Sequence, residues 1–440
     1  MILAVGILLG LNSVSSGQGN QGASVSQKYV IGKGWARNSV NAVIFRHKSV
    51  TSYKGSQYAA YYDPQGNMVL ARREHGSKTW EKHTTRYRAK VTDAHNAISM
   101  EVDGRGRLHV SWGMHGDTLN YAQSRQPGSL KLAGKMNMTG HNEARVTYPQ
   151  FYRLPNGDLA FIYRHGQSGS GDIILNRYYA EKQKWRQLQH PLISGEGERN
   201  AYLNTMAIDE SGGWHLSWTW RESWDVATNH DIMYAYSPDQ GQSWQDSEGN
   251  AYSLPITKEN AEIAWPVPQG SELINQTSMA IDSEGRPVIA TYWEDKEESG
   301  PQYRIVRHNG TAWHSYQVSR RDSGFSLSGG GTKRIPISRP QIVAGDRQDL
   351  YVIYRDLDRV AGITVARNRQ HGIYNKWDSI DIYRPSTGLW EPTLDVHLWK
   401  KQKELHLFGQ FVGQGDGEQI EDIEPQNVFI YKWIPKAYRD

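Results

Sequence analysis

The chain has 440 residues and no cysteine, which excludes disulfide bonds, thiolate catalysis and cysteine-ligated zinc. Lys and Arg outnumber Asp and Glu by 50 to 46, for a net charge of +4. This mild excess suits an anionic ligand but is far from the basic stripes of nucleic-acid-binding proteins. Trp and Tyr, at 16 and 25 copies against 7 Phe, suit carbohydrate contacts as well as a β-sheet core.

The N-terminus begins with an apolar run, Ile2–Leu11, followed by small and polar residues. Such a run is too short to span a bilayer but matches the core of a signal peptide. We therefore expect residues 1–22 to be a signal peptide and the protein to be secreted, either extracellular or periplasmic. A cytosolic location is the alternative, because no Lys or Arg precedes the run. No later segment is apolar enough to cross a membrane.

Short β-rich runs separated by turn residues fill the chain from residue 38 onward, with no convincing amphipathic helix. A turn containing Gly or Asp, followed by a β-rich run, recurs seven times. The copies begin at residues 63, 103, 155, 209, 282, 346 and 400. Intervals of roughly 40 to 70 residues are typical of propeller blades. We predict an all-β fold, a single seven-bladed β-propeller domain over residues 25–440, with six or eight blades as alternatives.

Two further patterns support the same architecture. Residues 237–244, SPDQGQSW, fit the Asp box, a β-hairpin turn in which Asp and Gly shape the turn and Trp packs between blades. The role of this box is interpreted as structural. The run VNAVIFRH, residues 40–47, precedes the first repeat. We expect it to be a strand that completes the last blade and closes the ring.

Polar residues stand at the ends of two neighbouring repeats. His95 and His115 are twenty residues apart in the first, and Tyr148 and Arg164 are sixteen apart in the second. Functional side chains tend to gather at such rim positions. Three other histidines lie inside strand runs and are interpreted as structural: His109, His215 and His406.

These residue types favour β-elimination next to a uronate carboxylate. The reaction needs the carboxylate charge neutralised, a base for the C5 proton and an acid for the departing O4. Arg binds a carboxylate bidentately with a permanent charge. His serves as a base or, when protonated, as a cation. A Tyr beside an Arg exchanges a proton more readily, because the cation lowers its pKa.

The segments DAHNAISMEVDGRGRLHVSWGMHGDTLNY and TYPQFYRLPNGDLAFIYRHGQSGSGDIILNRYY resemble BNR-repeat propeller polysaccharide lyases, especially ulvan lyases of families 25 and 24. The resemblance implies cleavage of ulvan, a sulfated rhamnose–uronate polysaccharide, to leave a 4,5-unsaturated uronate. It implies that His95 and Tyr148 are the catalytic acid/base pair, and that His115 and Arg164 neutralise the carboxylate. It further implies that Arg221, in LSWTWRESWD, binds a sulfate or carboxylate.

The expected partner is thus an anionic polysaccharide, with no nucleic acid and no membrane, and the protein is expected to be a monomer. No cofactor is expected to be required for catalysis. The resemblance is compatible with a structural metal, either calcium held by Asp and backbone oxygens or zinc held by His and Asp. The sequence assigns no complete set of ligands to it.

Other functions remain open at this stage. A related propeller enzyme would act as a rhamnose–glucuronate lyase or an α-L-rhamnosidase on arabinogalactan-type glycans, with His47 as a candidate on the opposite face. The simpler interpretation makes His47 a surface residue at a strand end. The Asp box and Arg334-Ile335-Pro336 also occur in sialidases, but there the tripeptide lies early in the chain. A non-catalytic sugar-binding propeller is the alternative from another class. The sequence does not distinguish endo from exo attack or glucuronate from iduronate. It also does not show whether sulfate is required.

Overall fold

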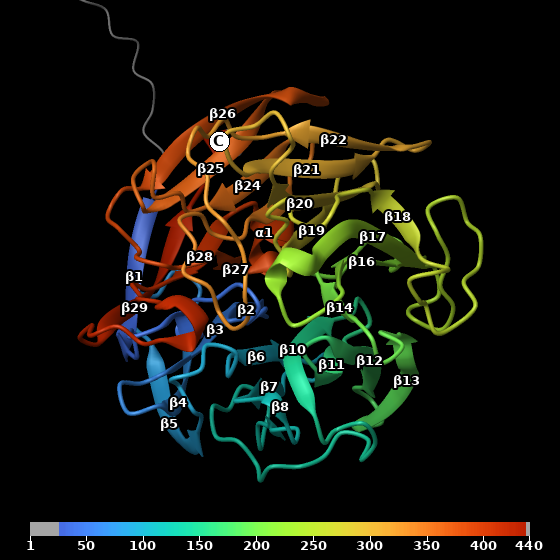
Figure 1. Cartoon of the computed structure of the whole chain (residues 1–440). Helices are drawn as coiled ribbons and strands as arrows, with labels where there is room; N and C mark the ends of the chain where they lie inside the picture. The colour runs from blue at the N-terminus through green and yellow to red at the C-terminus, as the bar shows by residue number, and fades with distance from the viewer. Residues whose placement is uncertain (1–25, 437–440) are drawn as a thin grey trace, which may run out of the picture.

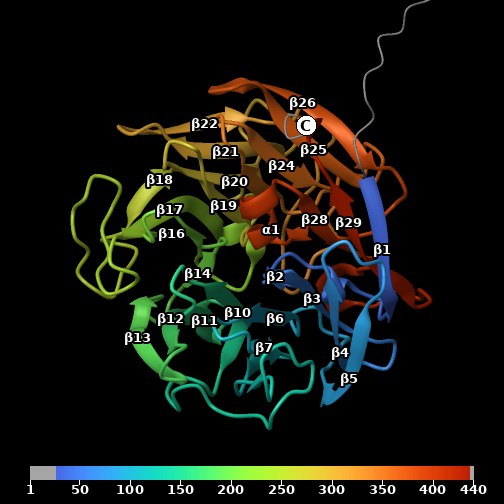
Figure 2. The same cartoon turned by 180° about the vertical axis from the view of Figure 1, so that it is seen from behind.

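The computed structural model describes residues 26–436, and the regular secondary structure of this part of the chain is almost entirely β-strand. Figure 1 shows the sheets following one another around a common centre, and Figure 2 shows the same arrangement from behind. The signal peptide predicted for residues 1–22 lies outside the described residues. Within the described part of the chain, no helix has the length and apolar character needed to cross a membrane.

Five of the six sheets are small, with three or four antiparallel strands each. The first is β2 (Val50–Tyr53), β3 (Ser56–Tyr62), β4 (Asn67–Glu74) and β5 (Glu81–Arg88). The second is β6 (Ile98–Val102), β7 (Leu108–Trp112) and β9 (Tyr121–Gln123). The third is β19 (Ser278–Ile281), β20 (Pro287–Trp293), β21 (Gln302–His308) and β22 (Trp313–Gln317). The fourth is β23 (Gln341–Ala344), β24 (Leu350–Tyr354), β25 (Ile363–Gln370) and β26 (Ile373–Tyr383). The last is β1 (Ser26–Gly34), β29 (Gln426–Trp433), β28 (Leu405–Gly409) and β27 (Thr393–Leu394).

The sixth sheet contains ten strands. Its first part is β8 (His115–Asp117), β10 (Val146–Arg153), β11 (Leu159–Gln167), β12 (Ser170–Tyr179) and β13 (Lys184–Ile193). Its second part is β14 (Asn200–Leu203), β15 (Ala207–Ile208), β16 (Trp214–Arg221), β17 (Asn229–Ser237) and β18 (Glu262–Trp265). A single parallel pairing, Gly171 with Asn200, joins β12 to β14 and so links the two parts.

Helical structure is sparse in residues 26–436. There is one short α-helix, α1 (Val396–Gln402), near the centre of the arrangement in Figure 1. Three single-turn 3₁₀ helices lie in loops: η1 (Ser39–Asn41), η2 (Val226–Thr228) and η3 (Asp416–Glu418). This agrees with the predicted scarcity of helix.

Each of the seven recurring sequence phrases leads into one strand: β4, β7, β11, β16, β20, β24 and β28, in chain order. In the second repeat, the Asp103 carboxylate accepts hydrogen bonds from the backbone N–H of Arg105 and Arg107, at 2.9 Å each, and so shapes the turn. In the Asp box, Asp239 accepts from the backbone of Ser243 at 2.8 Å, and Trp244 is fully buried. The box is therefore part of the packing between sheets, as its sequence indicates.

The strand that joins the two ends of the chain is not the predicted one. β1 pairs antiparallel with β29, whereas residues 40–47 form turns and η1. The apolar side chains of this run are buried without alternation, and the amide of Ile44 donates to the carboxylate of Glu391 at 3.0 Å. A strand would turn every second side chain to the opposite face. Residues 40–47 therefore cross the interior as a buried loop, and alternation in SQKYVIGKG marks the real closing strand.

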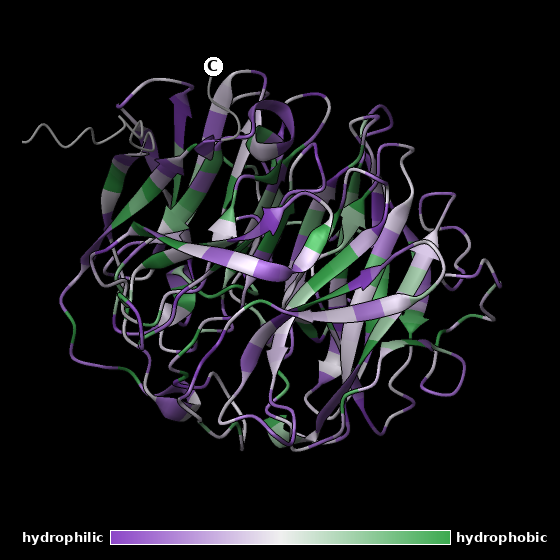
Figure 3. Ribbon diagram, turned by 90° about the horizontal axis from the view of Figure 1, so that it is seen from above, coloured by the Kyte–Doolittle hydropathy of each residue, from purple (hydrophilic) through white to green (hydrophobic). Residues whose placement is uncertain are grey.

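Hydrophobic residues, green in Figure 3, lie mainly along the strands, while many loops are hydrophilic. They form clusters between neighbouring sheets. One such cluster packs Tyr29 and Ile31 of β1 with Phe408, Val428 and residues of the first sheet. β1 thus joins the last sheet by hydrogen bonds to β29 and packs this sheet against the first by burial of apolar surface.

This closure predicts opposite outcomes for two adjacent residues of β1. Ile31 is buried and Val30 is 47% exposed. Ile31→Ala should lower the free energy of unfolding by about 2 to 5 kcal/mol, because it removes core contacts. Val30→Ala should change it by about 0.5 kcal/mol or less. Denaturant unfolding of both variants measures the difference, and equal effects would contradict the role assigned to β1.

Candidate active site

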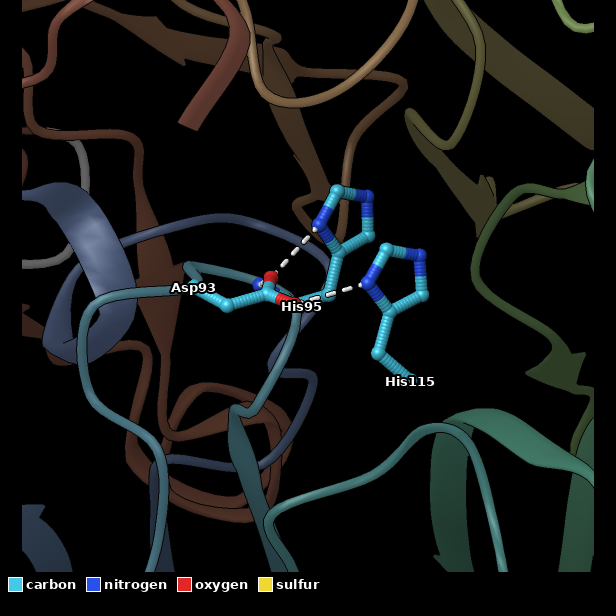
Figure 4. A group of neighbouring side chains, drawn as sticks. All are labelled: Asp93, His95 and His115. Carbon is cyan, nitrogen blue, oxygen red and sulfur yellow. Dashed lines mark hydrogen bonds and ion pairs between the residues drawn. The ribbon is translucent and has the colours of Figure 1, made fainter. Parts of the chain in front are cut away.

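The imidazole rings of His95 and His115 lie stacked, with centroids 3.9 Å apart and planes at 8°. His95 lies in the loop before β6, and His115 begins β8. The Asp93 carboxylate accepts a hydrogen bond from Nδ1 of each ring, at 3.1 Å from His95 and 2.8 Å from His115 (Figure 4). Both Nε2 atoms therefore face the same side, away from Asp93.

A second carboxylate reaches His95 from near the C-terminus. Glu418, in η3, lies 2.9 Å from His95 Nδ1. It also accepts hydrogen bonds from the backbone amides of Ala94 and Thr332. His95 is thus buried between two carboxylates. The more exposed His115 is bonded to Asp93 but not to Glu418.

The two histidines differ in charge. Burial opposes the positive charge of His95, but its hydrogen bonds to Asp93 and Glu418 outweigh burial and raise its pKa to about 9. Burial and the neighbouring His95 cation lower the pKa of His115, although Asp93 opposes this shift. The pKa of the Asp93 carboxyl is held well below its usual range by both imidazoles, against the effect of burial. Near neutral pH, His95 is therefore an imidazolium, and His115 is neutral with a lone pair on Nε2.

Tyr148 lies in β10, where the pairing with β11 is irregular between Thr147 and Gln150. Its φ of 56° is in the left-handed region, which is unusual for an aromatic residue. Its ring centroid lies 5.6 Å from that of His95 and 5.3 Å from that of Phe45. Bulges that redirect a side chain, and strained backbone of this kind, are enriched at functional sites.

Arg164 adjoins Tyr148 on the other side. Its guanidinium carbon lies 5.0 Å from the Tyr148 ring centroid, and its Nη2 donates to Thr147 Oγ1 at 3.0 Å. The side chain is buried, and its Nε has no hydrogen-bond partner within the described residues. A buried guanidinium with an unsatisfied donor is suited to bind an anion.

Arg221, at the end of β16, completes the cluster. Its Nη1 donates to the Tyr202 hydroxyl at 3.3 Å, and its guanidinium carbon lies 4.2 Å from the Tyr202 ring centroid. Its Nε donates to Asn229 at 2.8 Å and its Nη2 to Asn275 at 2.7 Å. Each of its three nitrogens thus has a partner in the protein. A direct contact from Arg221 to a sulfate or carboxylate stays a prediction.

Tyr202, in β14, is a site residue that the sequence analysis missed. Its hydroxyl lies 3.5 Å from Arg164 Nη1 and 3.2 Å from the Ser168 hydroxyl. Burial would raise its pKa, but the cations Arg221 and Arg164 lower it to about 7. Burial and the nearby Tyr202 raise the pKa of Tyr148. Tyr202 is therefore the more acidic phenol, and Tyr148 keeps its proton.

The structure brings all five predicted site residues into one continuous cluster. Contacts run from His115 to His95, then to Tyr148, Arg164, Tyr202 and Arg221. Asp93, Glu418 and Tyr202 are the additions. Asp93 could be found in the sequence as the near neighbour of His95, whereas Glu418 and Tyr202 lie in distant segments with no distinguishing motif.

The three histidines interpreted as structural lie elsewhere. His109 is fully buried and bonded to Asp103 at 3.1 Å, and His215 is bonded to Asp209 at 3.2 Å. His406 is buried beside Glu404. In each case a strand histidine is tied to an acidic residue in or next to a turn, which fits the structural interpretation.

His47 is buried, so its interpretation as a surface residue was wrong. Burial lowers its pKa to about 3. It lines a separate cavity of about 1180 Å³ that also includes the turn residues Gly104 and Gly157. Gly104 follows β6, whereas His95 precedes it, so this cavity lies at the other end of the strand. Arg334 of the sialidase-like tripeptide is exposed and paired with Glu421.

One group in residues 26–436 offers three carboxylate or imidazole ligand atoms within 4.8 Å of one another, namely Asp93, His95 and His115. The same atoms are joined by hydrogen bonds at 3.1 and 2.8 Å, so a metal ion would have to replace the proton on Nδ1 of both rings. The predicted structural calcium or zinc ion stays a prediction.

Comparison with known proteins assigns the class. A family model described as a BNR repeat-containing family member matches residues 56–321, more than half of the chain. The chain therefore belongs to the BNR repeat-containing family.

The chain is similar to ulvan lyases in sequence and fold. It is 23% identical over 317 residues to Ulvan Lyase-PL25 of Pseudoalteromonas sp. (strain PLSV), covering 61% of this chain and 63% of that protein. It is 22% identical over 316 residues to an ulvan lyase of Nonlabens ulvanivorans, covering 62% and 66%. The chain thus spans slightly less than two thirds of these relatives. A structure of PL25 ulvan lyase bound to -[GlcA(1-4)Rha3S]- matches with a TM-score of 0.66 at 15% identity, over 92% of this chain and 95% of that one.

The shared carboxylate predicts the titration of the two rings. Replacing Asp93 by Asn removes one of the two charges that stabilise protonated His95, so the pKa of His95 should fall from about 9 toward its ordinary value. NMR titration of the imidazole protons measures this shift. Asp209→Asn, which alters the partner of His215, is the matched control and should leave His95 unchanged. An unaltered His95 pKa in Asp93→Asn would contradict the assignment.

Proposed function

We propose that this chain is a polysaccharide lyase that cleaves ulvan by β-elimination. The observation that carries the proposal is the contact of a cation, a neutral base, a protonated phenol and a buried guanidinium in one cluster: His95, His115, Tyr148 and Arg164. The names of the similar proteins, and the uronate–sulfated rhamnose unit bound in one of them, support ulvan as the substrate.

In the proposed reaction, Arg164 and His95 neutralise the uronate carboxylate. The buried guanidinium of Arg164 and the imidazolium Nε2–H of His95 supply donors to its oxygens. Withdrawal of the carboxylate charge acidifies the C5 proton, because the electron pair left at C5 spreads into the carboxyl group. Burial of both side chains strengthens the effect, since water screens their charges little.

The neutral His115 then takes the C5 proton on Nε2. The electron pair forms the C4=C5 double bond, the C4–O4 bond breaks, and Tyr148 gives its proton to O4. This division exchanges the roles that the sequence predicted for the two histidines. The exchange is supported by the opposite pKa shifts of His95 and His115.

The proposed scaffold is a seven-bladed β-propeller. The ten-stranded sheet counts as two blades if it is divided at its single parallel pairing, between β12 and β14. With the five smaller sheets, this division gives one blade for each of the seven sequence repeats. We further propose a single domain and a monomer.

Export is proposed from the apolar run Ile2–Leu11, since a polymer such as ulvan is met outside the cell. No cofactor is included in the proposed reaction, and a structural calcium or zinc ion remains part of the proposal.

The function is tested by incubating the protein with ulvan and following the ultraviolet absorbance of the unsaturated uronate. Tyr148→Phe should lower kcat by about 10²- to 10⁴-fold, because it removes the acid and keeps the ring. Its affinity for ulvan oligosaccharides should stay near that of the parent. Tyr53→Phe, which deletes a hydroxyl bonded to Gly104 at the other end of β6, is the control. Rapid turnover by folded Tyr148→Phe would remove Tyr148 from the mechanism, and absence of unsaturated product from the parent would reject the lyase.

The charge on His95 predicts the alkaline limit of activity. The pKa of His95 is raised, so the cation persists through neutral pH and is lost as pH rises through about 9. Elimination should decline over the same range. Glu418→Gln removes one of the charges that raise this pKa, so it should move the alkaline decline to lower pH. Profiles of kcat/KM against pH measure the alkaline limit of the parent and of Glu418→Gln. The same alkaline limit in both proteins would contradict the role of His95.

A further inference from the structure

Trp224 is the most exposed of the large apolar side chains in residues 26–436, at 62%. The other members of this exposed set are aliphatic. Exposure of an indole to water is unfavourable, and Trp presents a broad flat face suited to stacking. The exposed indole of Trp224 is therefore a candidate for contact with a ligand.

The backbone around Trp224 is held firmly. The Asp225 carboxylate accepts hydrogen bonds from the amides of Ala227, at 2.9 Å, and Gly329, at 2.7 Å. The Val226 amide donates to the Gly329 carbonyl at 3.0 Å. The loop is thus fixed by its neighbours while the indole stays exposed. Such a preorganised side chain loses little conformational entropy when it binds.

On one side, the loop lies against the catalytic cluster. A Cβ added to Gly169 would lie 3.3 Å from the backbone nitrogen of Trp224, so the tip of the β11–β12 hairpin touches this loop. The hairpin carries Arg164, and Ser168 at its tip lies 3.2 Å from the Tyr202 hydroxyl. Trp224 also follows Arg221 by only three residues, or about 11 Å of extended chain.

On the other side, a second segment connects the indole to His95. A Cβ added to Gly330 would lie 3.2 Å from Cε3 of Trp224. Two residues further on, the Thr332 amide donates to Glu418, the carboxylate that lies 2.9 Å from His95 Nδ1. Trp224 thus lies between the β11–β12 hairpin, which carries Arg164, and the segment 330–332, which contacts Glu418 beside His95.

The charges near Trp224 indicate which sugar it takes. Asp225 is adjacent, and Glu222 is bonded to Arg199 at 3.0 Å and to Lys258 at 2.7 Å. The loop 222–228 itself carries these two acids and no Lys or Arg. The loop thus supplies no cation of its own to pair with a uronate carboxylate, so a uronate is disfavoured there. The apolar face of a deoxy sugar ring, with its sulfate turned away, fits better.

We propose that Trp224 is the stacking platform of a subsite for the rhamnose next to the uronate at the cleavage point. This inference rests on the proposed lyase function and adds the sugar recognised beside the catalytic cluster. Trp224 contributes to binding the chain and to no proton transfer, so its loss raises KM and leaves kcat near the parent value.

The test uses Trp224→Ala, the conservative Trp224→Phe, and the control Ile380→Ala, which truncates a 49% exposed side chain in β26. Lyase kinetics on ulvan are measured for each. Affinity for a saturated ulvan tetrasaccharide is measured with each change on a Tyr148→Phe background, where turnover is suppressed. Trp224→Ala should raise KM and Kd about tenfold, as loss of an aromatic stacking contact predicts. Trp224→Phe should recover most of the affinity, and Ile380→Ala should match the parent.

A measurement that keeps Trp224 in place is independent of any effect of its replacement on folding. In the Tyr148→Phe protein, where turnover is suppressed, N-bromosuccinimide oxidises exposed indoles first, and the tetrasaccharide should protect Trp224 from it. Unchanged affinity in Trp224→Ala, or no protection, would overturn the subsite while ulvan cleavage by the parent leaves the lyase function standing. Binding of no ulvan oligosaccharide by any form would reject both. Loss of a dimer in Trp224→Ala, seen by size-exclusion chromatography, would instead assign the indole to contact between two copies.

Discussion

The carboxylate of Asp93 accepts a hydrogen bond from each of two stacked histidines, and the chemistry of the site depends on this sharing. Two stacked imidazoles 3.9 Å apart repel each other when both are protonated, so a second positive charge is unfavourable. Asp93 stabilises one positive charge on the pair, and Glu418 stabilises it further on His95 alone. The result is an asymmetric pair, in which one ring is a cation and its neighbour is a neutral base. The proposed elimination uses the cation at the uronate carboxylate and the base at C5.

The fold supplies the positions. The cluster draws on the loop before β6, on β8, on the irregular start of β10, and on the ends of β11 and β16. These segments lie in two neighbouring sheets and meet at one end of their strands. The local bulge at Tyr148, with its left-handed φ, directs that ring between His95 and Arg164. η3 adds Glu418 from the C-terminal part of the chain, so the charge on His95 depends on closure of the whole arrangement by β1 and β29.

The sequence predicted the β architecture because its turns are local: Asp103 bonds amides two and four residues away, and the same pattern recurs along the chain. It also identified five residues of the cluster, four from their positions at the ends of two repeats and Arg221 from the resemblance to ulvan lyases. Glu418 and Tyr202 could not be found in this way, because their roles arise from contacts over hundreds of residues or from two flanking arginines. The closing strand was misassigned for a related reason. The apolar run at 40–47 looks like a strand, but burial on all sides makes it an interior loop.

The mass of the products released from ulvan tests the central claim most directly. Elimination breaks the C4–O4 bond without adding water, so each cleavage leaves one new non-reducing end that is an unsaturated uronate. Hydrolysis adds one water for every bond broken. We predict that the fragments together weigh no more than the parent chain, with one unsaturated uronate for every bond broken. Fragments heavier by one water per cleavage, with saturated ends, would contradict it.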